Sequence, residues 1–291
     1  MKQWDGTTYG NGWMHRTLIR ILRLCDVRLL YAFAAVFVLP VCLVFRPGGA
    51  IIYRYFRQRF HYSRLKSLWM TFVNHYQFSQ VVIDRFAMYG GKKFKVEVEG
   101  YEHFRKLADR PEGFVMLSSH VGNYELAGYT LTADRKRFNA LVFYGEKASV
   151  MENRNKMFAG TNIRMIPISP DMSHIFVISK ALEDGETVSM PADRLFGSKK
   201  SLKIPFLGEE ALFPMGPFSV ATMRSLDALA VNVMKTSVKG YTVYVTPLTY
   251  DKTAPRRQQI NELAQSYVTE LERMVKRYPA QWYNYFEFWK A

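Results

Sequence analysis

The chain has 291 residues, 48% of them hydrophobic and 15% aromatic, which excludes a disordered protein. Its 40 lysines and arginines against 25 aspartates and glutamates give a formal net charge of +15, which indicates an anionic partner. No zinc-finger, helix-turn-helix or RNA-recognition pattern is visible, so we expect no nucleic acid partner and favour anionic lipid or an acidic carrier protein. Cys25 and Cys42 offer neither a disulfide framework nor a metal-ligand cluster, which fits a reducing compartment.

An uncharged apolar run of seventeen residues, Leu29 to Phe45, lies near the N-terminus and contains Pro40. It is short for a membrane-spanning helix and ends at an arginine, so we do not expect a cleaved signal peptide. Arginines flank it on both sides: Arg16, Arg20, Arg23 and Arg28 before it, then Arg46, Arg54, Arg57 and Arg59. We predict that residues 1–50 form a membrane anchor, spanning or re-entrant, ahead of one domain at 51–291; the alternative is a buried core helix. The segment Trp4 to Gly10 suggests no role.

Strands and helices are expected to alternate along the rest of the chain. Strands are predicted at 94–100, in the run that ends at His120, and at 140–143, 165–168, 187–190, 229–235 and 241–248. A helical hairpin is predicted at 50–89, with further helices at 101–109, 124–131, 150–160, 173–183, 216–225 and 256–277. This pattern indicates an α/β fold, a mixed central sheet with helices on its faces. The aromatic tail at 282–289 either caps the core or lies in the membrane interface.

The most informative stretch is the apolar strand that ends at His120 and is followed by Glu125 five residues later. Gly122 permits a turn between them, and Asn123 is a good cap for the next helix. Glu125 could then fold back onto the imidazole, fix its tautomer and make His120 a general base. In the alternative, His120 is an ordinary strand-end residue and Glu125 a first-turn acid favoured by the helix dipole.

The sequence Ser-Ser-His-x-Gly-Asn-Tyr-Glu-Leu-Ala-Gly from Ser118 resembles the His-x4-Asp/Glu block of the lysophospholipid acyltransferase superfamily. Its form is closest to the Gly-Asn-Trp-Glu version that marks the bacterial lipid A late acyltransferases. Tyr124 stands where tryptophan is usual, and Glu125 where many members have aspartate. The resemblance extends from about Arg54 to Trp289, nearly the whole chain.

Further blocks fit this resemblance. It implies that Arg154, or secondly Arg164, contacts the phosphate or sugar of the acceptor, and that Asp193 and Arg194 position the acceptor or stabilise the oxyanion. Arg154 could instead lie on a solvated helical face, and Asp193–Arg194 could be a surface ion pair of little value. A zinc site of His120, Glu125 and Asp193 is a remote alternative, because no second histidine lies at ligand spacing.

Two glycine-containing segments and the C-terminus complete the resemblance. The segments that contain Gly208 and Gly216 resemble those that line the acyl and acceptor cleft, although both glycines could be plain turn residues. The sequence Pro279-Ala-Gln-Trp282 resembles the Pro-x-x-Trp pattern common near the C-terminus of this family.

The resemblance implies a membrane-associated acyltransferase on the cytoplasmic face of the bacterial inner membrane. The acyl donor would be acyl carrier protein or acyl-CoA, and the acceptor a hydroxyl of a glycolipid such as a lipid A precursor. No cofactor or metal is implied, and Asn123 is expected near the substrate. A lysophospholipid or an acylated amino acid is the alternative acceptor. A non-enzymatic, basic membrane-binding protein is the alternative of another class.

Overall fold

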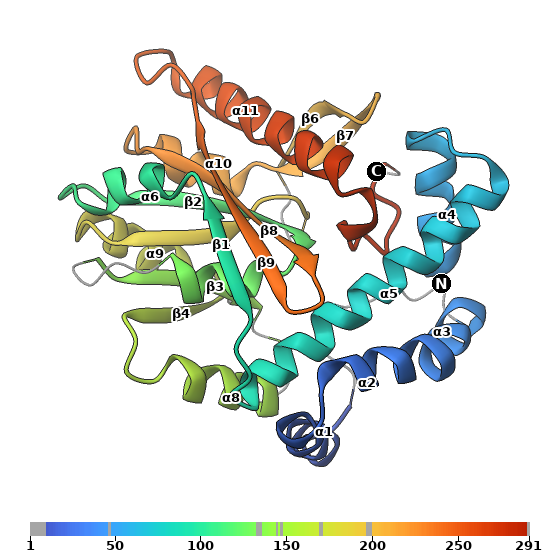
Figure 1. The fold of residues 1–291 in the computed structure, drawn as a ribbon. Helices are drawn as coiled ribbons and strands as arrows, with labels where there is room; N and C mark the ends of the chain where they lie inside the picture. Colours follow the sequence, from blue (N-terminus) through green and yellow to red (C-terminus); the bar gives the residue numbers. More distant parts are fainter. Residues whose placement is uncertain are drawn as a thin grey trace.

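The computed structural model describes residues 10–45, 48–131, 136–143, 145, 148–168, 171–195 and 200–289. Within these ranges, seven strands form one sheet in the order β1-β9-β8-β2-β5-β3-β4 (Figure 1). Their bounds are β1 Lys95–Glu99, β2 Phe114–Gly122, β3 Phe138–Phe143, β4 Ile163–Ile168, β5 Thr187–Pro191, β8 Ala228–Ser237 and β9 Gly240–Leu248. All neighbouring strands are parallel except β8 and β9, which form an antiparallel pair. The predicted mixed α/β sheet is therefore confirmed.

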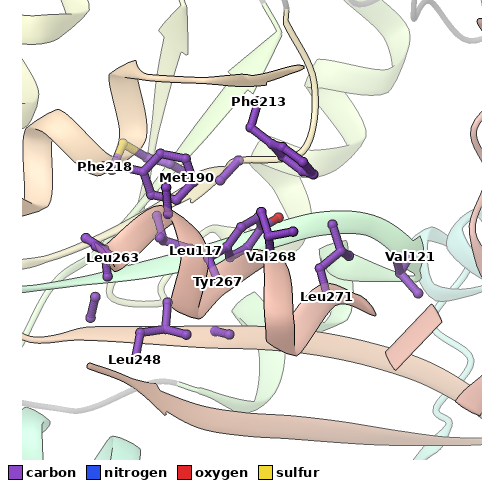
Figure 2. Close-up of a cluster of buried hydrophobic side chains, with 14 of the residues drawn as sticks. Leu117, Val121, Met190, Phe213, Phe218, Leu248, Leu263, Tyr267, Val268 and Leu271 are labelled. Carbon is purple, nitrogen blue, oxygen red and sulfur yellow. The ribbon is translucent and has the colours of Figure 1, made fainter. Parts of the chain in front are cut away.

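The two faces of the sheet bury different sets of helices because side chains alternate along each strand. From β2, Val115 and Leu117 join one core and Phe114 and Met116 the other. The first core receives α9 (His174–Glu183), α10 (Gly216–Thr222) and α11 (Arg256–Arg277), and the second receives α6 (Tyr101–Ala108). Figure 2 shows Leu117 and Met190 of the sheet with Leu263 and Tyr267 of α11 in the first core.

Two local features differ from the sequence prediction. The helix expected at 124–131 begins as a 3-10 turn, η2 (Tyr124–Leu126), before α7 (Ala127–Thr130), and the Asn123 side chain does not cap it. The hairpin of β6 (Ser201–Phe206) and β7 (Glu209–Pro214) was not predicted. Its Pro205 and Gly208 read as turn signals, yet only Leu207 and Gly208, both at positive φ, form the two-residue turn between the strands.

Among the described residues, four helices precede the sheet. They are α1 (Gly12–Leu24), a continuous helix made of α2 (Val27–Phe33), the π-helical segment η1 (Ala34–Val38) and α3 (Leu39–Phe45), then α4 (Gly48–Arg59) and α5 (Arg64–Tyr89). The predicted hairpin corresponds to α4 and α5, whereas α1 was not anticipated. Residues Val27–Val44 are long and apolar enough to cross a membrane, and only 22% of them are buried. The buried core helix considered from the sequence is therefore wrong. Arg46 and residues 4–9 lie outside the described residues.

The aromatic tail at 282–289 caps the core. Of the two positions that the sequence allowed, the core and the membrane interface, the structure shows the first. Trp282 and Phe288 are buried in the first core. Asn74 of α5 donates its side-chain amide to the carbonyls of Ala280 and Trp282, each at 3.0 Å, and Tyr285 donates its hydroxyl to Asn74 at 3.0 Å. These bonds tie the tail to the long helix α5.

Candidate active site

His120 lies in a bulge near the carboxyl end of β2. Ser118 pairs with Val231 of β8 and Gly122 pairs with Val233, so three residues of β2 face the single residue Asn232. Gly122 has φ +63, and a Cβ atom there would lie 1.9 Å from the Val233 carbonyl oxygen. Only glycine fits such an approach, and the bulge carries His120 out of the regular strand.

Asp193 is the carboxylate that holds the His120 ring. Nδ1 of His120 lies 2.8 Å from Oδ1 of Asp193, and the His120 backbone N–H donates to Oδ2 at 2.9 Å. Asp193 reaches this position because it follows β5, the parallel neighbour of β2, and the Ala192 N–H donates to the Ser118 carbonyl at 2.9 Å. The expectation that Glu125 folds back onto the imidazole is therefore wrong.

The electrostatics of this pair favour a neutral imidazole beside a charged carboxylate. Burial, and then the nearby Arg194 guanidinium, lower the pKa of His120 below its ordinary value, although Asp193 acts in the opposite direction. Burial acts to raise the pKa of Asp193, but His120 and Arg194 hold it below its usual range. The Asp193 carboxylate then accepts a hydrogen bond from the N–H at Nδ1, which leaves the lone pair on Nε2. No described group bonds to Nε2, and the side chain is 22% exposed. This nitrogen can therefore take a proton from a substrate.

Glu125 lies in a second cluster, between two arginines. Arg85 of α5 donates to its Oε1 at 3.0 Å. Arg154 of α8 (Ala148–Phe158) donates from Nη2 to Oε1 and from Nε to Oε2, the latter at 3.4 Å. Burial acts to raise the pKa of Glu125, yet Arg154 and Arg85 lower it to about 2. Glu125 thus joins α5 to α8 instead of orienting His120.

Arg154 is buried, so the solvated helical face considered from the sequence is wrong for this residue. Its guanidinium points at a protein carboxylate, and its predicted contact with an acceptor phosphate or sugar stays a prediction. Tyr124, next to Glu125, links this cluster to the site, because its ring meets the His120 ring edge to face with centroids 5.3 Å apart.

Arg194 and the C-terminal tail border His120 on another side. Arg194 donates from Nη2 to the Tyr283 carbonyl at 2.7 Å, and its guanidinium lies 5.4 Å from the centre of the Phe286 ring. The Tyr283 N–H donates to the His120 carbonyl at 3.3 Å. Asp193 is fully buried and Arg194 partly so, which makes the surface ion pair wrong as a description of these residues. The tail therefore fixes both the strand end and the arginine beside it.

The remaining predicted site residues are not brought to His120 by the contacts of the structure. Arg164 lies on the edge strand β4, opposite Asn139 of β3, and lines a small cavity of about 130 Å³ with His174. The strand register places it level with Val115, five residues before His120, so about 16 Å separate the two along the strand direction.

Gly208, Gly216 and Asn123 have backbone roles. Gly208 occupies the β6–β7 turn, and Gly216 begins α10. Asn123 is buried and donates its N–H to the Val233 carbonyl at 2.7 Å, which closes the bulge. Contact of these three residues with substrate stays a prediction.

Sequence reasoning missed the pairing of Asp193 with His120 and the roles of Arg85 and Tyr283. One signal was available for the first: both His120 and Asp193 directly follow buried strands, whose carboxyl ends share one edge if the strands are parallel. Arg85 and Tyr283 carried no such signal. The zinc site considered for His120, Glu125 and Asp193 does not form, since no three His, Cys, Asp or Glu side chains gather as metal ligands in the described part of the chain.

Comparisons with known proteins show the family of this chain. A family model described as bacterial lipid A biosynthesis acyltransferase matches residues 88–291. No curated protein sequence matches the chain significantly. Among solved structures, the chain is similar to the 1-acyl-sn-glycerophosphate acyltransferase PlsC from Thermotoga maritima, with 16% identity, a TM-score of 0.39 and coverage of 92% of this chain and 99% of that chain. Because the family model covers well over half of the chain, including β2, β5 and the tail around His120, the protein belongs to the bacterial lipid A biosynthesis acyltransferases and is an acyltransferase.

Proposed function

We propose that the protein transfers a fatty acyl group from a thioester donor to a hydroxyl group of a glycolipid such as a lipid A precursor. The observation that carries this proposal is the His120–Asp193 pair with its open Nε2. Nε2 takes the proton of the acceptor hydroxyl as its oxygen attacks the acyl carbonyl. The C–S bond of the thioester then breaks, and the sulfur of the donor takes the proton from Nε2 and leaves as a thiol. Asp193 fixes the tautomer of His120 and stabilises the imidazolium that forms.

The acyl group passes directly from donor to acceptor in this scheme. Ser118 and Ser119 precede the base, yet the Ser119 hydroxyl donates to Asn232 at 2.9 Å within the sheet. Arg194, held by the Tyr283 carbonyl, is the cation that stabilises the developing oxyanion. Arg154 and Arg85 keep two guanidinium groups beside Tyr124, where they favour an acceptor with a phosphate or acidic headgroup.

The donor in this proposal is acyl carrier protein, because an acidic carrier complements a chain of net charge +15. Such a donor and the apolar N-terminal helices support the part of the proposal that locates the enzyme on the cytoplasmic face of the bacterial inner membrane. A lysophospholipid or an acylated amino acid would use the same base and differ only in the acceptor pocket. A non-enzymatic membrane-binding role is disfavoured by the intact His120–Asp193 pair.

The decisive experiment combines lipid profiles with a purified reaction. Mass spectrometry of lipids from cells with and without the gene should show one glycolipid that loses a single acyl chain. The purified enzyme should acylate the deacylated form of that lipid, and His120→Asn should not. Loss of an acyl chain from phospholipids or aminolipids alone would contradict the glycolipid assignment.

A salt series tests the donor. The Michaelis constant for acyl carrier protein should rise steeply with salt, since attraction between opposite charges is screened within about 10 Å at 0.1 M. A flat response would favour acyl-CoA.

A further inference from the structure

Helix α1 presents three different stripes. His15, Ile19 and Leu22 recur at spacings of four and three, and their side chains are buried. Exposed arginines recur at the same spacings one residue later: Arg16, Arg20 and Arg23. The third stripe is apolar and exposed, with Trp13 at 68% and Leu24 at 88%, and with Met14 and Ile21 between them. A helix with a packed stripe, a cationic stripe and an outward apolar stripe suits the surface of an anionic bilayer.

The apolar helix that follows is attached lengthwise to the rest of the protein. Its segments α2, η1 and α3 all contact α5. Its buried stripe includes Val27, Tyr31 and Ala34, which pack with Ile83 and Phe86 of α5. The opposite stripe is exposed and wholly apolar: Leu29, Phe33, Val36, Phe37, Val41 and Val44. Figure 1 shows α1, α2 and α3 on the side of α5 that faces away from the sheet.

A polar cluster at the start of this helix fixes it to the catalytic body. Tyr31 donates its hydroxyl to Asp84 of α5, and Asp84 accepts a bond of 2.6 Å from Lys235 of β8. If the helix crossed the bilayer in this arrangement, α5 and these charged groups would enter the hydrocarbon with it. Burial of charge there is costly, so the attached helix is compatible with lying along the membrane surface and not with crossing it.

The charge of α1 and the α2–α3 helix indicates which partner binds their exposed face. Residues 12–45 contain four arginines and one acidic residue, Asp26, which pairs with Lys239 at 2.6 Å. A second copy of the same surface would bring arginine stripes together, whereas anionic headgroups would neutralise them. The first two turns of α5 carry the exposed Leu65, Leu68 and Trp69. Tryptophans at such positions are typical of membrane interfaces.

We propose that α1 and the α2–α3 helix form one in-plane surface that inserts into a single leaflet containing anionic phospholipid, so that the chain does not cross the membrane. This inference goes beyond the proposed function and does not depend on the acyl donor or acceptor. It also places the N-terminus and the catalytic body on the same side of the bilayer.

Protease protection of the full chain tests the topology. A cleavable tag is added before Met1 and a second one after Ala291, and sealed membrane vesicles of both orientations are treated with the protease. We expect both tags to be cut in vesicles of one orientation and neither in the other. Cleavage of one tag in each orientation would show a membrane span and would overturn the proposal, whatever the acyltransferase activity proves to be.

Vesicle flotation tests the stripes of α1 with a matched control. The full-length protein is incubated with vesicles of phosphatidylcholine alone or with phosphatidylglycerol added. Replacing Arg16, Arg20 and Arg23 by Ser should weaken binding about tenfold or more, only to vesicles with phosphatidylglycerol. Leu24→Glu should weaken binding to both, whereas Phe176→Glu, at an 80% exposed position on α9, should not. Equal binding by the α1 variants and the control would overturn the role of α1. The proposal would also be overturned if Leu24→Glu dissociated an oligomer of the protein and left membrane binding unchanged. That result would show that the surface binds a second copy of the chain.

Discussion

The buried cluster around Asp84 and the His120–Asp193 pair differ in whether all their hydrogen-bonding groups have partners within the protein. In the Asp84 cluster, Tyr31 donates to one carboxylate oxygen, Tyr241 and Lys235 to the other, and Lys235 also donates to Tyr31 and to the Val238 carbonyl. In the His120–Asp193 pair, the carboxylate is occupied but Nε2 of the ring has no partner among the described residues.

The difference separates a structural cluster from a reactive one. A cluster whose donors and acceptors are all satisfied joins elements, here α2, α5, β8 and β9, and has no atom left for a substrate. A pair with one open, partly exposed nitrogen can exchange a proton. Burial raises the pKa of Asp84 and lowers that of Lys235, so desolvation opposes the charged forms of both groups. A buried ion pair of this kind fixes geometry more than it adds net stability.

The largest expected effect comes from removing the open nitrogen. His120→Asn keeps an N–H donor near Asp193 but has no counterpart of Nε2, so acyl transfer should fall by about 10²–10⁴-fold. The melting temperature should stay close to that of the wild type, as measured by circular dichroism. Retention of more than about a tenth of the activity would rule out His120 as the base.

Breaking the closed cluster should affect stability instead. Lys235→Met leaves Asp84 buried without its cation, and we expect the free energy of unfolding to fall by about 3–5 kcal/mol in urea denaturation. The folded fraction should transfer acyl groups at nearly the wild-type rate. The double variant Asp84→Leu, Lys235→Met is the control and should recover much of the loss. A double variant no more stable than Lys235→Met would show that the ion pair itself supplies the stability.

Asp193→Asn tests the orienting carboxylate through both rate and pH. The activity should fall by about 10²–10³-fold, because the amide no longer holds the tautomer that leaves Nε2 free. The neutral imidazole is the active form, so activity declines as pH falls through the pKa of His120. Asp193 raises that pKa, hence its removal should move the acid limb of kcat/KM to lower pH. An acid limb that moves to higher pH would contradict the arrangement.

The smallest effect is expected at Glu125, which the sequence had suggested as the orienting acid. Arg154 and Arg85 hold its pKa at about 2, so it stabilises the fold at neutral pH and loses this contribution as pH falls from about 4.5 to 2. Glu125→Gln should cost up to about 3 kcal/mol of stability at pH 7 and flatten the acid unfolding profile. The acid limb of kcat/KM should not move. A shift like that of Asp193→Asn would restore Glu125 as the partner of His120.

The sequence alone determined most elements of the fold and singled out His120 as the candidate base. Alternation in the strands and three- to four-residue spacing in the helices are local patterns, so β1, β8, β9 and α11 were found close to their observed bounds. His120 was found because it ends a buried strand beside a glycine that permits a turn. The β6–β7 hairpin and α1 were missed, the first because its segment was assigned to the acyl and acceptor cleft on the resemblance alone.

The tertiary structure alone decided which carboxylate meets His120. Asp193 lies 73 positions along the chain from His120, and the two residues meet because β5 pairs with β2 in a parallel register. Strand order is set by how two cores of side chains pack on the faces of the whole sheet, and no local pattern encodes it. Local patterns did not encode the contacts of Glu125 either. Its short separation from His120 in the sequence had led to the expectation that the two side chains meet. Arg85 and Arg154 take its carboxylate instead, because α5 and α8 pack on either side of it.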